Sequence, residues 1–289
     1  MRSPVTVLGG RRRAGAPGQG RRRLIPGRLR ARLLHNRVAR AIRLSRAVTR
    51  PARFVLAEAV LRDGRARTWQ LRDGVPVLLR SGGRDLDIFE EIFHAGEYDP
   101  PDEVAAILRA RPRPRVVDLG GNIGLFALRM FQRLPGCTVT SFEPDPGNLE
   151  LLLACRAAAG LADRWTVHPV AAGVVEGRAA FLSGQEADSR VVAPGLGTIE
   201  VPVWDVFEHL GGCDLLKIDI EGGEWDILAD ERFGAAGATA VALEFHGYRR
   251  PFGDDIRAAA TELLRRCGYL VRHVAWHPVG VGRLWAWRG

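Results

Sequence analysis

The chain has 289 residues, 46% of them hydrophobic, and a formal net charge of +9. This length accommodates one large core with an accessory segment and is short for two full domains. The charge is uneven, because residues 1–50 hold 15 Arg and no acidic residue, whereas the other 239 residues hold 27 basic and 33 acidic groups. The body of the protein therefore lacks the charge of a nucleic-acid-binding domain, and only its N-terminal arm is basic.

Several other classes of protein are excluded by what the sequence does not contain. No stretch approaches the ~20 apolar residues of a membrane-spanning helix, and the Arg-rich N-terminus lacks the apolar core of a signal peptide. The four cysteines form neither a zinc-binding motif nor a disulfide framework; they are Cys137, Cys155, Cys213 and Cys267. We expect a cytoplasmic protein without a membrane span.

The N-terminal arm, residues 1–50, combines two kinds of sequence. Residues 1–27 mix Gly, Pro and Arg without hydrophobic periodicity and are expected to be disordered. The apolar residues from Leu29 to Val48 have a loosely helical spacing, which predicts a basic amphipathic helix. This helix is either a solvated arm or a contact for a polyanion or a membrane surface.

Residues 51–111 are expected to form an accessory unit of a hairpin and helices. Asp73 and Gly74 stand between two apolar runs within residues 66–80, which is the usual signal of a β-hairpin. The segments FEEIFHAGEY and DEVAAILRAR then predict two short helices.

From residue 112 to the end, strand-like and helix-like segments alternate. The predicted strands include RVVDLG, TVTSFEP, WTVHPVAA, DLLKIDIEG and ATAVALEF, and helical segments separate them. This alternation predicts an α/β fold with a doubly wound, mostly parallel sheet and helices on both faces. The last two apolar runs, YLVRHV and RLWAWR, have no helix between them and are expected to close the sheet as an antiparallel pair.

Ligands of doubly wound sheets bind at the carboxyl ends of the strands. The first strand ends in a turn that supplies Asp118, Gly120, Gly121, Asn122 and Gly124, and the second strand ends at Glu143. The glycines allow a sharp turn and a close approach to a ligand. Glu143, 25 residues beyond Asp118, stands where an acid would bind both ribose hydroxyls of an adenosyl group.

A dinucleotide and S-adenosylmethionine are the two ligands to compare at this turn. Dinucleotide-binding turns have glycine where Asp118 or Asn122 stands here, and they keep helix N-terminal amides free for a pyrophosphate. The carboxylate of Asp118 would repel that pyrophosphate, but it suits the ammonium and sulfonium charges of S-adenosylmethionine. The methyl donor is therefore favoured.

The segments DLGGNIGLF, FEPDP, VAAGVVEGRAAF and LLKIDIEGGEWDIL together resemble the FkbM family of methyltransferases. The resemblance covers roughly residues 85–250, and KIDIEGGE is its most specific part. It implies a Rossmann-like seven-stranded sheet, a methyltransferase domain over residues 112–289, S-adenosylmethionine as donor, and usually O-methylation of sugars or secondary metabolites. The donor-binding positions that it implies are Asp118, Gly120, Asn122, Gly124 and Glu143, with Ala171 near the adenine.

A charged pattern follows the fourth strand of this domain. Lys217, Asp219 and Glu221 alternate with isoleucines, so they share one face while the segment is extended. Burying charges in a central strand costs several kcal/mol unless they are paired, which predicts the open end of a crevice. Lys217 is the only lysine of the chain, and an ion pair between it and one of the two acids, which would anchor the loop, is the alternative.

Glu244 and His246 repeat this pattern at the end of the next strand, and the two ends are neighbours if the strand order follows the family. Methyl transfer to an alcohol requires that a proton leave the hydroxyl. His246, Asp219 and Glu221 are candidates for the base, and a mechanism without a dedicated base stays open. A Mg²⁺ ion held by Asp219 and Glu221 could instead acidify the hydroxyl.

The sequence favours a small-molecule hydroxyl acceptor over two rivals. An RNA methyltransferase could use the Arg-rich arm, but the body is acidic and no NPPY-like or DPPY-like motif follows the fourth strand, so nucleic acid is not the expected partner. A non-catalytic binding module would not need Asp118, Glu143 and Asp219 together. The acceptor, the oligomeric state and the role of the arm are left open.

Overall fold

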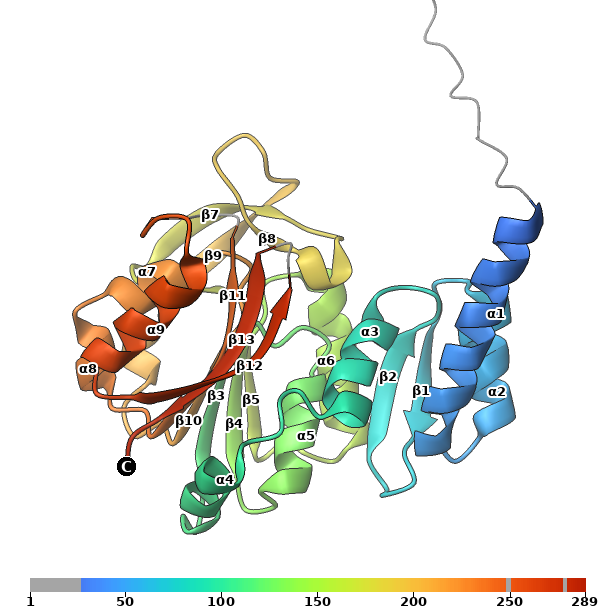
Figure 1. Cartoon of the computed structure of the whole chain (residues 1–289), viewed down its shortest axis with the longest axis horizontal. Coiled ribbons are helices and arrows are strands. Elements are labelled where there is room, and N and C mark those ends of the chain that lie inside the picture. The colour runs from blue at the N-terminus through green and yellow to red at the C-terminus, as the bar shows by residue number, and fades with distance from the viewer. Residues whose placement is uncertain (1–26, 248–250, 278–279) are drawn as a thin grey trace, which may run out of the picture.

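The computed structural model describes residues 27–247, 251–277 and 280–289, and its centre is a seven-stranded sheet (Figure 1). The strand order is β12-β13-β11-β10-β3-β4-β5. The strands are β3 (Arg115–Leu119), β4 (Thr138–Phe142), β5 (Trp165–His168), β10 (Leu215–Ile218), β11 (Ala240–His246), β12 (Leu270–His277) and β13 (Val281–Trp287). Of the seven strands, only β13 runs opposite to the other six, so the mostly parallel sheet and its antiparallel end are both confirmed.

Helices cover both faces of this sheet (Figure 1). One face carries α5 (Leu125–Arg133) and α6 (Pro146–Ala158), and the other carries α7 (Glu224–Ala229), α8 (Arg232–Ala236) and α9 (Ile256–Arg266). Consecutive strand residues point to opposite faces. Val116 accordingly belongs to the buried cluster under α5 and α6, whereas Val117 belongs to the cluster under α7 and α9.

A second sheet lies across the carboxyl edge of the first, at the top of Figure 1. Its strands are β6 (Ala171–Gly173), β7 (Gly177–Leu182), β8 (Arg190–Val191) and β9 (Ile199–Asp205), in the order β6-β9-β7-β8. The short 3-10 turns η4 (Glu186–Asp188) and η5 (Val206–His209) adjoin it. The segment VAAGVVEGRAAF supplies β6 and β7, but the two do not form the expected hairpin, because β9 lies between them and pairs with both. The strands β8 and β9 were not predicted from the sequence.

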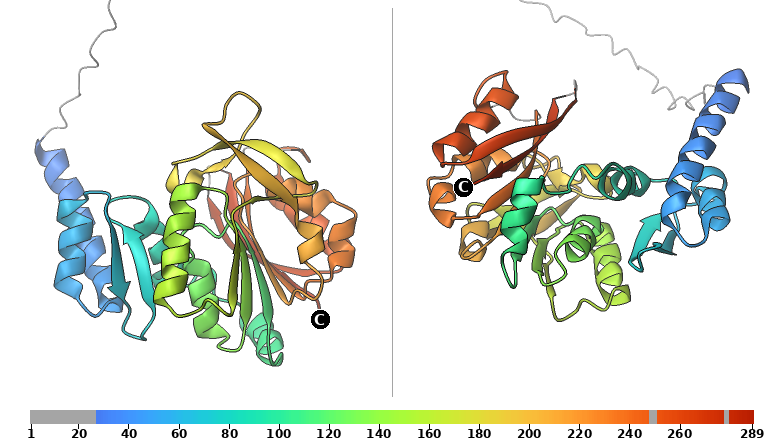
Figure 2. Two further views of the ribbon diagram at one scale, coloured as in Figure 1. Left: turned by 180° about the vertical axis from the view of Figure 1, so that it is seen from behind. Right: turned by 60° about the horizontal axis from the view of Figure 1, so that its bottom comes forward.

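The N-terminal segments form a unit beside α6 (Figure 2). Its elements are α1 (Gly27–Leu44), η1 (Ser45–Ala47), α2 (Pro51–Val55), the π-helical turn η2 (Leu56–Leu61), β1 (Ala66–Gln70), β2 (Pro76–Arg80), α3 (Asp85–Phe89) and the π-helical turn η3 (Glu90–Ala95). The next helix, α4 (Asp102–Arg109), lies apart from this unit, at the foot of the central sheet (Figure 1). The predicted hairpin is confirmed, because β1 and β2 pair antiparallel around Gly74, whose φ is +94°. The two short helices after it are confirmed as well.

The helix expected in the basic arm is present as α1, and it ends at Leu44. Leu44 and Val48 are buried in the cluster that also holds Phe54 and residues of the central sheet. Arg40 pairs with Asp87 on α3, at 2.6 Å. The disorder expected for residues 1–27 concerns positions that, apart from Gly27, lie outside the described residues. Within the described ranges, no helix combines the length and the apolar character that a membrane span requires.

Candidate functional site

Two adjoining pockets open where the parallel strands end. Pocket A has an empty volume of about 610 Å³, and its lining includes Phe142, Glu143, Ala171, Phe181 and Val191. Pocket B has an empty volume of about 660 Å³, and its lining includes Asp87, Glu91, Tyr98, Lys217 and Glu244. The residues common to both linings are Gly120, Asn122, Ala187, Asp219 and Glu221. The two pockets therefore meet at the predicted glycine turn and at the two acids after β10.

The glycine turn is shaped by its protein neighbours. Gly120 has a φ of +83°, and a Cβ atom there would lie 1.9 Å from the carbonyl oxygen of Asp219. Gly124 has a φ of +87°, and its Cβ would lie 2.6 Å from the ring of Trp165. Gly121 borders pocket B, whereas Gly124 borders neither pocket. A side chain is thus excluded at Gly120 and Gly124 by packing, while the close approach to a ligand stays a prediction for Gly120 and Gly121, which border the pockets.

Glu143 lies at the end of β4 and faces pocket A. Its two carboxylate oxygens accept the backbone N–H groups of Asn122, at 2.7 Å, and Asp145, at 2.8 Å. Burial raises the pKa of Glu143 to about 7, although these two hydrogen bonds favour the ionised form. A carboxylate has about four lone-pair sites, so Glu143 can still accept hydrogen bonds from a diol in the pocket.

Asp118 lies beneath the glycine turn, fully buried, and borders neither pocket. Its carboxylate accepts a hydrogen bond from the Ser141 hydroxyl at 3.0 Å and lies 3.3 Å from the Lys217 ammonium. Burial raises the pKa of Asp118, and the charge of Lys217 opposes this shift. The expected direct contact with a ligand ammonium does not fit this position, because the partners of Asp118 belong to the protein.

Lys217 ties the ends of β3 and β10 together. Its ammonium donates to the carbonyl oxygen of Gly120 at 2.7 Å and lies 3.4 Å from the carboxylate of Asp219. Burial lowers the pKa of Lys217, but the charges of Asp219 and Asp118 outweigh it and raise the pKa overall. Lys217 is therefore a fixed cation at the floor of pocket B, in the ion pair that was the structural alternative.

The alternating pattern after β10 holds for one step and then breaks. Lys217 and Asp219 share a face, as their short separation shows. Glu221 has a φ of +54° and Gly222 a φ of +105°, so the chain turns away from the strand there. The turn nevertheless leaves Glu221 in the lining of both pockets. Burial, with the nearby charges of Asp219 and Glu244, raises the pKa of Glu221 to about 8.

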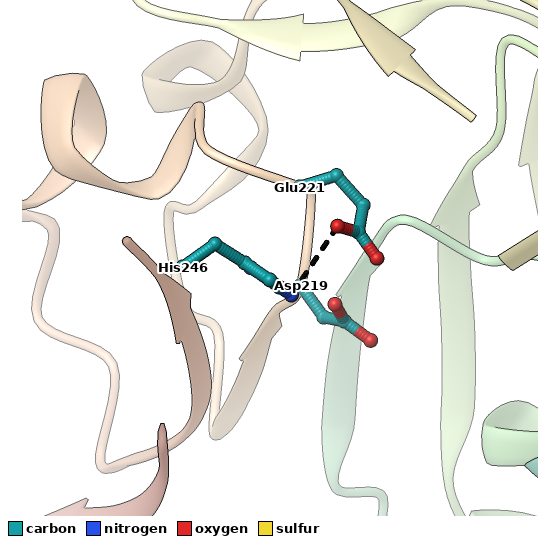
Figure 3. Close-up of side chains that lie close together, drawn as sticks. All are labelled: Asp219, Glu221 and His246. Carbon is teal, nitrogen blue, oxygen red and sulfur yellow. Dashed lines mark ion pairs between the residues drawn. The ribbon is translucent and has the colours of Figure 1, made fainter. Parts of the chain in front are cut away.

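His246 stands at the end of β11, beside the end of β10, as expected from the strand order. Its Nε2 lies 3.3 Å from a Glu221 oxygen (Figure 3). The same Nε2 lies 3.6 Å from Glu244, and the Nδ1 of the ring lies 3.2 Å from Glu224. Burial alone would lower the pKa of His246, but hydrogen bonds to Glu224 and Glu244 and the charges of Glu224 and Glu221 raise it to about 12. His246 borders neither pocket. The expected role as a base does not fit an imidazolium held in this way.

Tyr98 and Arg283 are site residues that sequence reasoning missed. The buried Tyr98 hydroxyl lies 2.7 Å from Glu244 and 3.1 Å from Asp219. The guanidinium of Arg283 donates to Glu244 at 2.8 Å and lies 4.4 Å from the centre of the Tyr98 ring. Tyr98 is the last residue of the FEEIFHAGEY segment, so this segment could have indicated that Tyr98 belongs to the site. Arg283 becomes visible only when β13 pairs with β11 and places it opposite Glu244.

The segment 183–190 covers the junction of the pockets, because Ala187 borders both. One oxygen of Asp145 accepts hydrogen bonds from Ser183, Gly184 and Ser189, at 2.8–2.9 Å. Its other oxygen caps the N-terminus of α6. Asp145 lies in the FEPDP segment, which is part of the family resemblance. The sequence did not predict that Asp145 contacts a segment about 40 residues further along the chain.

Comparisons with known proteins give one family and several relatives. The family model described as the Methyltransferase FkbM domain matches residues 118–271. A protein named Methyltransferase 1 from Beauveria bassiana is 30% identical over 141 residues, which cover 39% of this chain and 56% of that protein. The chain thus spans little more than half the length of this curated relative.

Solved structures are similar at lower identity. A SAM-dependent methyltransferase from Agrobacterium tumefaciens has a TM-score of 0.44 and 14% identity, with 78% of this chain and 70% of that chain covered. A precorrin-6y C5,15-methyltransferase from Geobacter metallireducens has a TM-score of 0.40 and 14% identity, with 64% and 87% covered.

Proposed function

The chain belongs to the FkbM methyltransferase family, and we propose that it transfers a methyl group from S-adenosylmethionine to a hydroxyl of a small molecule, such as a sugar or a secondary metabolite. One observation carries the proposal beyond the family. Two pockets of ligand size meet at Asp219 and Glu221, so a donor in one pocket and an acceptor in the other would meet beside two carboxylates.

Pocket A fits the adenosyl part of the donor. Phe142, Ala171 and Phe181 supply an apolar lining for a flat base, and Glu143 offers carboxylate oxygens for the ribose hydroxyls. S-adenosylmethionine, when bound, supplies a methyl group on a positively charged sulfur. Glu143 and Ala171 are thus the predicted donor-binding residues that line pocket A away from the junction, while Gly120 and Asn122 form the junction itself.

Pocket B fits the acceptor. Asp219 and Glu221 reach it from the loop after β10, and they can orient a hydroxyl and receive its proton as the O–CH₃ bond forms and the S–CH₃ bond breaks. Lys217 and Tyr98 hold Asp219 in position through its contacts at 3.4 Å and 3.1 Å. The Mg²⁺ ion expected as an alternative to a protein base would occupy the same junction.

The lining of pocket B argues against RNA as the acceptor. Six carboxylates surround the pocket, against the two cations Arg84 and Lys217; they are Asp87, Glu91, Asp188, Asp219, Glu221 and Glu244. A phosphate backbone would meet repulsion there, since RNA binding depends on neutralising phosphates. We therefore keep the small-molecule acceptor as the proposal.

Asp219→Asn tests the proposal. By calorimetry we expect S-adenosylhomocysteine to bind in the micromolar range, about −8 kcal/mol. A screen of glycosides, polyketides and lipid-linked sugars for donor consumption then identifies the acceptor. With the acceptor so found, Asp219→Asn should lower kcat by ~10² or more and change donor affinity by less than about twofold. Glu176→Gln, on an exposed loop, is the surface control.

Two outcomes would contradict this proposal. Absence of donor binding would remove the methyl-transfer assignment. Full activity of Asp219→Asn with a true acceptor would show that the proton is handled elsewhere and that pocket B is not the acceptor site.

A further inference from the structure

Three side chains from two strand ends converge between the pockets. Asp219 and Glu221 come from the loop after β10, and His246 reaches toward them from the end of β11 (Figure 3). One ligand atom from each residue lies within 4.8 Å of the other two. Oxygen and imidazole nitrogen atoms in one cluster are the donor set of many first-row divalent metal ions.

His246 is held as metal-ligating histidines are held. Its Nδ1 lies 3.2 Å from an oxygen of Glu224, which is itself fully buried and also accepts the backbone N–H groups of Gly222 and His246. A carboxylate on one ring nitrogen fixes the orientation of the ring and aims the other nitrogen at the metal. Here the nitrogen aimed at the cluster is Nε2, 3.3 Å from Glu221. Two ligand atoms that each lie about 2.1 Å from one ion, at a right angle, are about 3 Å apart. The distance between Nε2 and Glu221 is therefore close to that of two ligands of one ion.

Glu221 adds a second observation. Its Oε2 is shielded from solvent and accepts no hydrogen bond, and it faces Nε2 of His246 at 3.3 Å. A carboxylate oxygen without a donor is costly inside a protein. The cluster faces both pockets through Asp219 and Glu221, so an ion there would keep positions for a further ligand from either pocket.

We propose that Asp219, Glu221 and His246 bind one divalent transition-metal ion, of the kind represented by Mn²⁺, and that the ion holds the acceptor hydroxyl. The role of the ion rests on the proposed methyl transfer, whereas the site itself does not. An imidazole ligand favours a transition metal over Mg²⁺, which prefers an all-oxygen shell and retained water. The proposed ion is therefore a transition metal with His246 as a third ligand, in place of the Mg²⁺ that the sequence suggested with Asp219 and Glu221 as ligands.

An ion held by these residues would polarise a bound hydroxyl oxygen and make its proton easier to lose, to Asp219 or to water, as the O–CH₃ bond forms and the S–CH₃ bond breaks. Glu224 does not touch the ion and is a positioning residue. A metal ligand must be a neutral imidazole, so binding of the ion displaces the proton that the surrounding carboxylates otherwise hold on Nε2 of His246. The alternative is that this proton stays on His246 and that no metal binds.

Mn²⁺ alone, added to the full-length metal-free protein without donor or acceptor, is the test. Electron paramagnetic resonance titration should show one bound Mn²⁺ per chain, and the pulsed spectrum of the complex should show coupling to an imidazole ¹⁴N nucleus. This signature identifies His246 without a substitution in a buried site, and it does not depend on activity. Mg²⁺ should displace Mn²⁺ only in large excess.

Variants locate the ion. Glu221→Gln should weaken Mn²⁺ binding more than tenfold, and Glu224→Gln about 10- to 100-fold with a weakened nitrogen coupling. Asp87→Asn, which removes a carboxylate that lines pocket B outside the cluster and pairs with Arg40, is the control and should change the affinity by less than about twofold.

The outcomes separate this inference from the proposed function. No stoichiometric Mn²⁺, or bound Mn²⁺ without nitrogen coupling, would overturn the metal site, and methyl transfer by metal-free protein would then leave the proposed function standing. Mn²⁺ bound with nitrogen coupling in a protein that binds no S-adenosylhomocysteine would keep the metal site and remove the proposed function.

Discussion

Among single residues, Glu143 links the charge of a buried carboxyl to the proposed donor site. Burial raises its pKa to about 7 in the free protein. Hydrogen bonds from ribose hydroxyls are stronger to its ionised form than to its protonated form. Donor binding should therefore release a proton below pH 7. We expect the affinity for S-adenosylhomocysteine, measured by calorimetry, to rise by up to about tenfold between pH 6 and pH 8 and to level off above pH 8.

Glu143→Gln is the control for this pH dependence. The variant should bind S-adenosylhomocysteine about 1–3 kcal/mol more weakly, because charge-assisted hydrogen bonds are lost, and its affinity should not vary over the same pH range. The same slope in the variant and in the unchanged protein would assign the released proton to another group and remove the ribose role from Glu143.

Gly124 tests whether the turn is set by packing. Gly124→Ala should lose stability twice, through a left-handed backbone at a residue with a side chain and through the clash of its Cβ with Trp165 at 2.6 Å. Gly160→Ala is matched, because Gly160 has a φ of +65° and open space around its Cβ. In denaturant titration we expect a loss of about 1 kcal/mol for Gly160→Ala and about 1–3 kcal/mol more for Gly124→Ala. Equal losses would mean that the contact with Trp165 does not restrict the turn.

At the level of elements, α1 is divided between a docked end and an exposed end. Leu44 is fully buried, whereas Leu34 is 50% exposed. We expect Leu44→Ala to cost about 2–5 kcal/mol of unfolding free energy and Leu34→Ala less than about 0.5 kcal/mol, measured by denaturant titration. Deletion of residues 1–27 should leave both stability and donor binding unchanged.

The opposite result for the deletion would be informative. Loss of soluble protein after removal of residues 1–27 would show that this segment packs on the body. A large effect of Leu34→Ala would show that the exposed end of α1 contacts another surface in solution.

In the whole molecule, the basic charge lies in the N-terminal arm and the rest of the chain is acidic, so any affinity for nucleic acid should reside in the arm. Deletion of residues 1–27 removes seven arginines and leaves the acidic lining of pocket B in place. Any binding of RNA by the full chain should weaken linearly with the logarithm of salt concentration, and it should vanish in the deleted protein. Fluorescence anisotropy at several salt concentrations measures this. RNA binding that survives the deletion and resists salt would make RNA the leading acceptor.

Most of the architecture follows from local patterns in the sequence. Alternation of strand-like and helix-like segments predicted the parallel sheet, and the missing helix between YLVRHV and RLWAWR predicted its antiparallel end, because each pattern involves neighbours along the chain. The strand-end rule placed Glu143 and Asp219 at pocket linings for the same reason. The strand β8 was not found, because two residues carry no periodicity. The strand β9 was missed although Ile199, Val201 and Val203 alternate along it.

Tertiary structure decided what each predicted charge does. Period 2 could not reveal that Glu221 adopts a positive φ, that Asp118 is enclosed by Ser141 and Lys217, or that Glu224 holds His246. The contacts of Asp118 and of Glu224 join segments about 20 to 100 residues apart. Sequence by itself determined which charges stand at strand ends, since that depends on local periodicity. Only the fold decided which of them are paired, buried or open to a pocket, since the pKa and the reach of a side chain depend on neighbours brought together by the packing of distant elements.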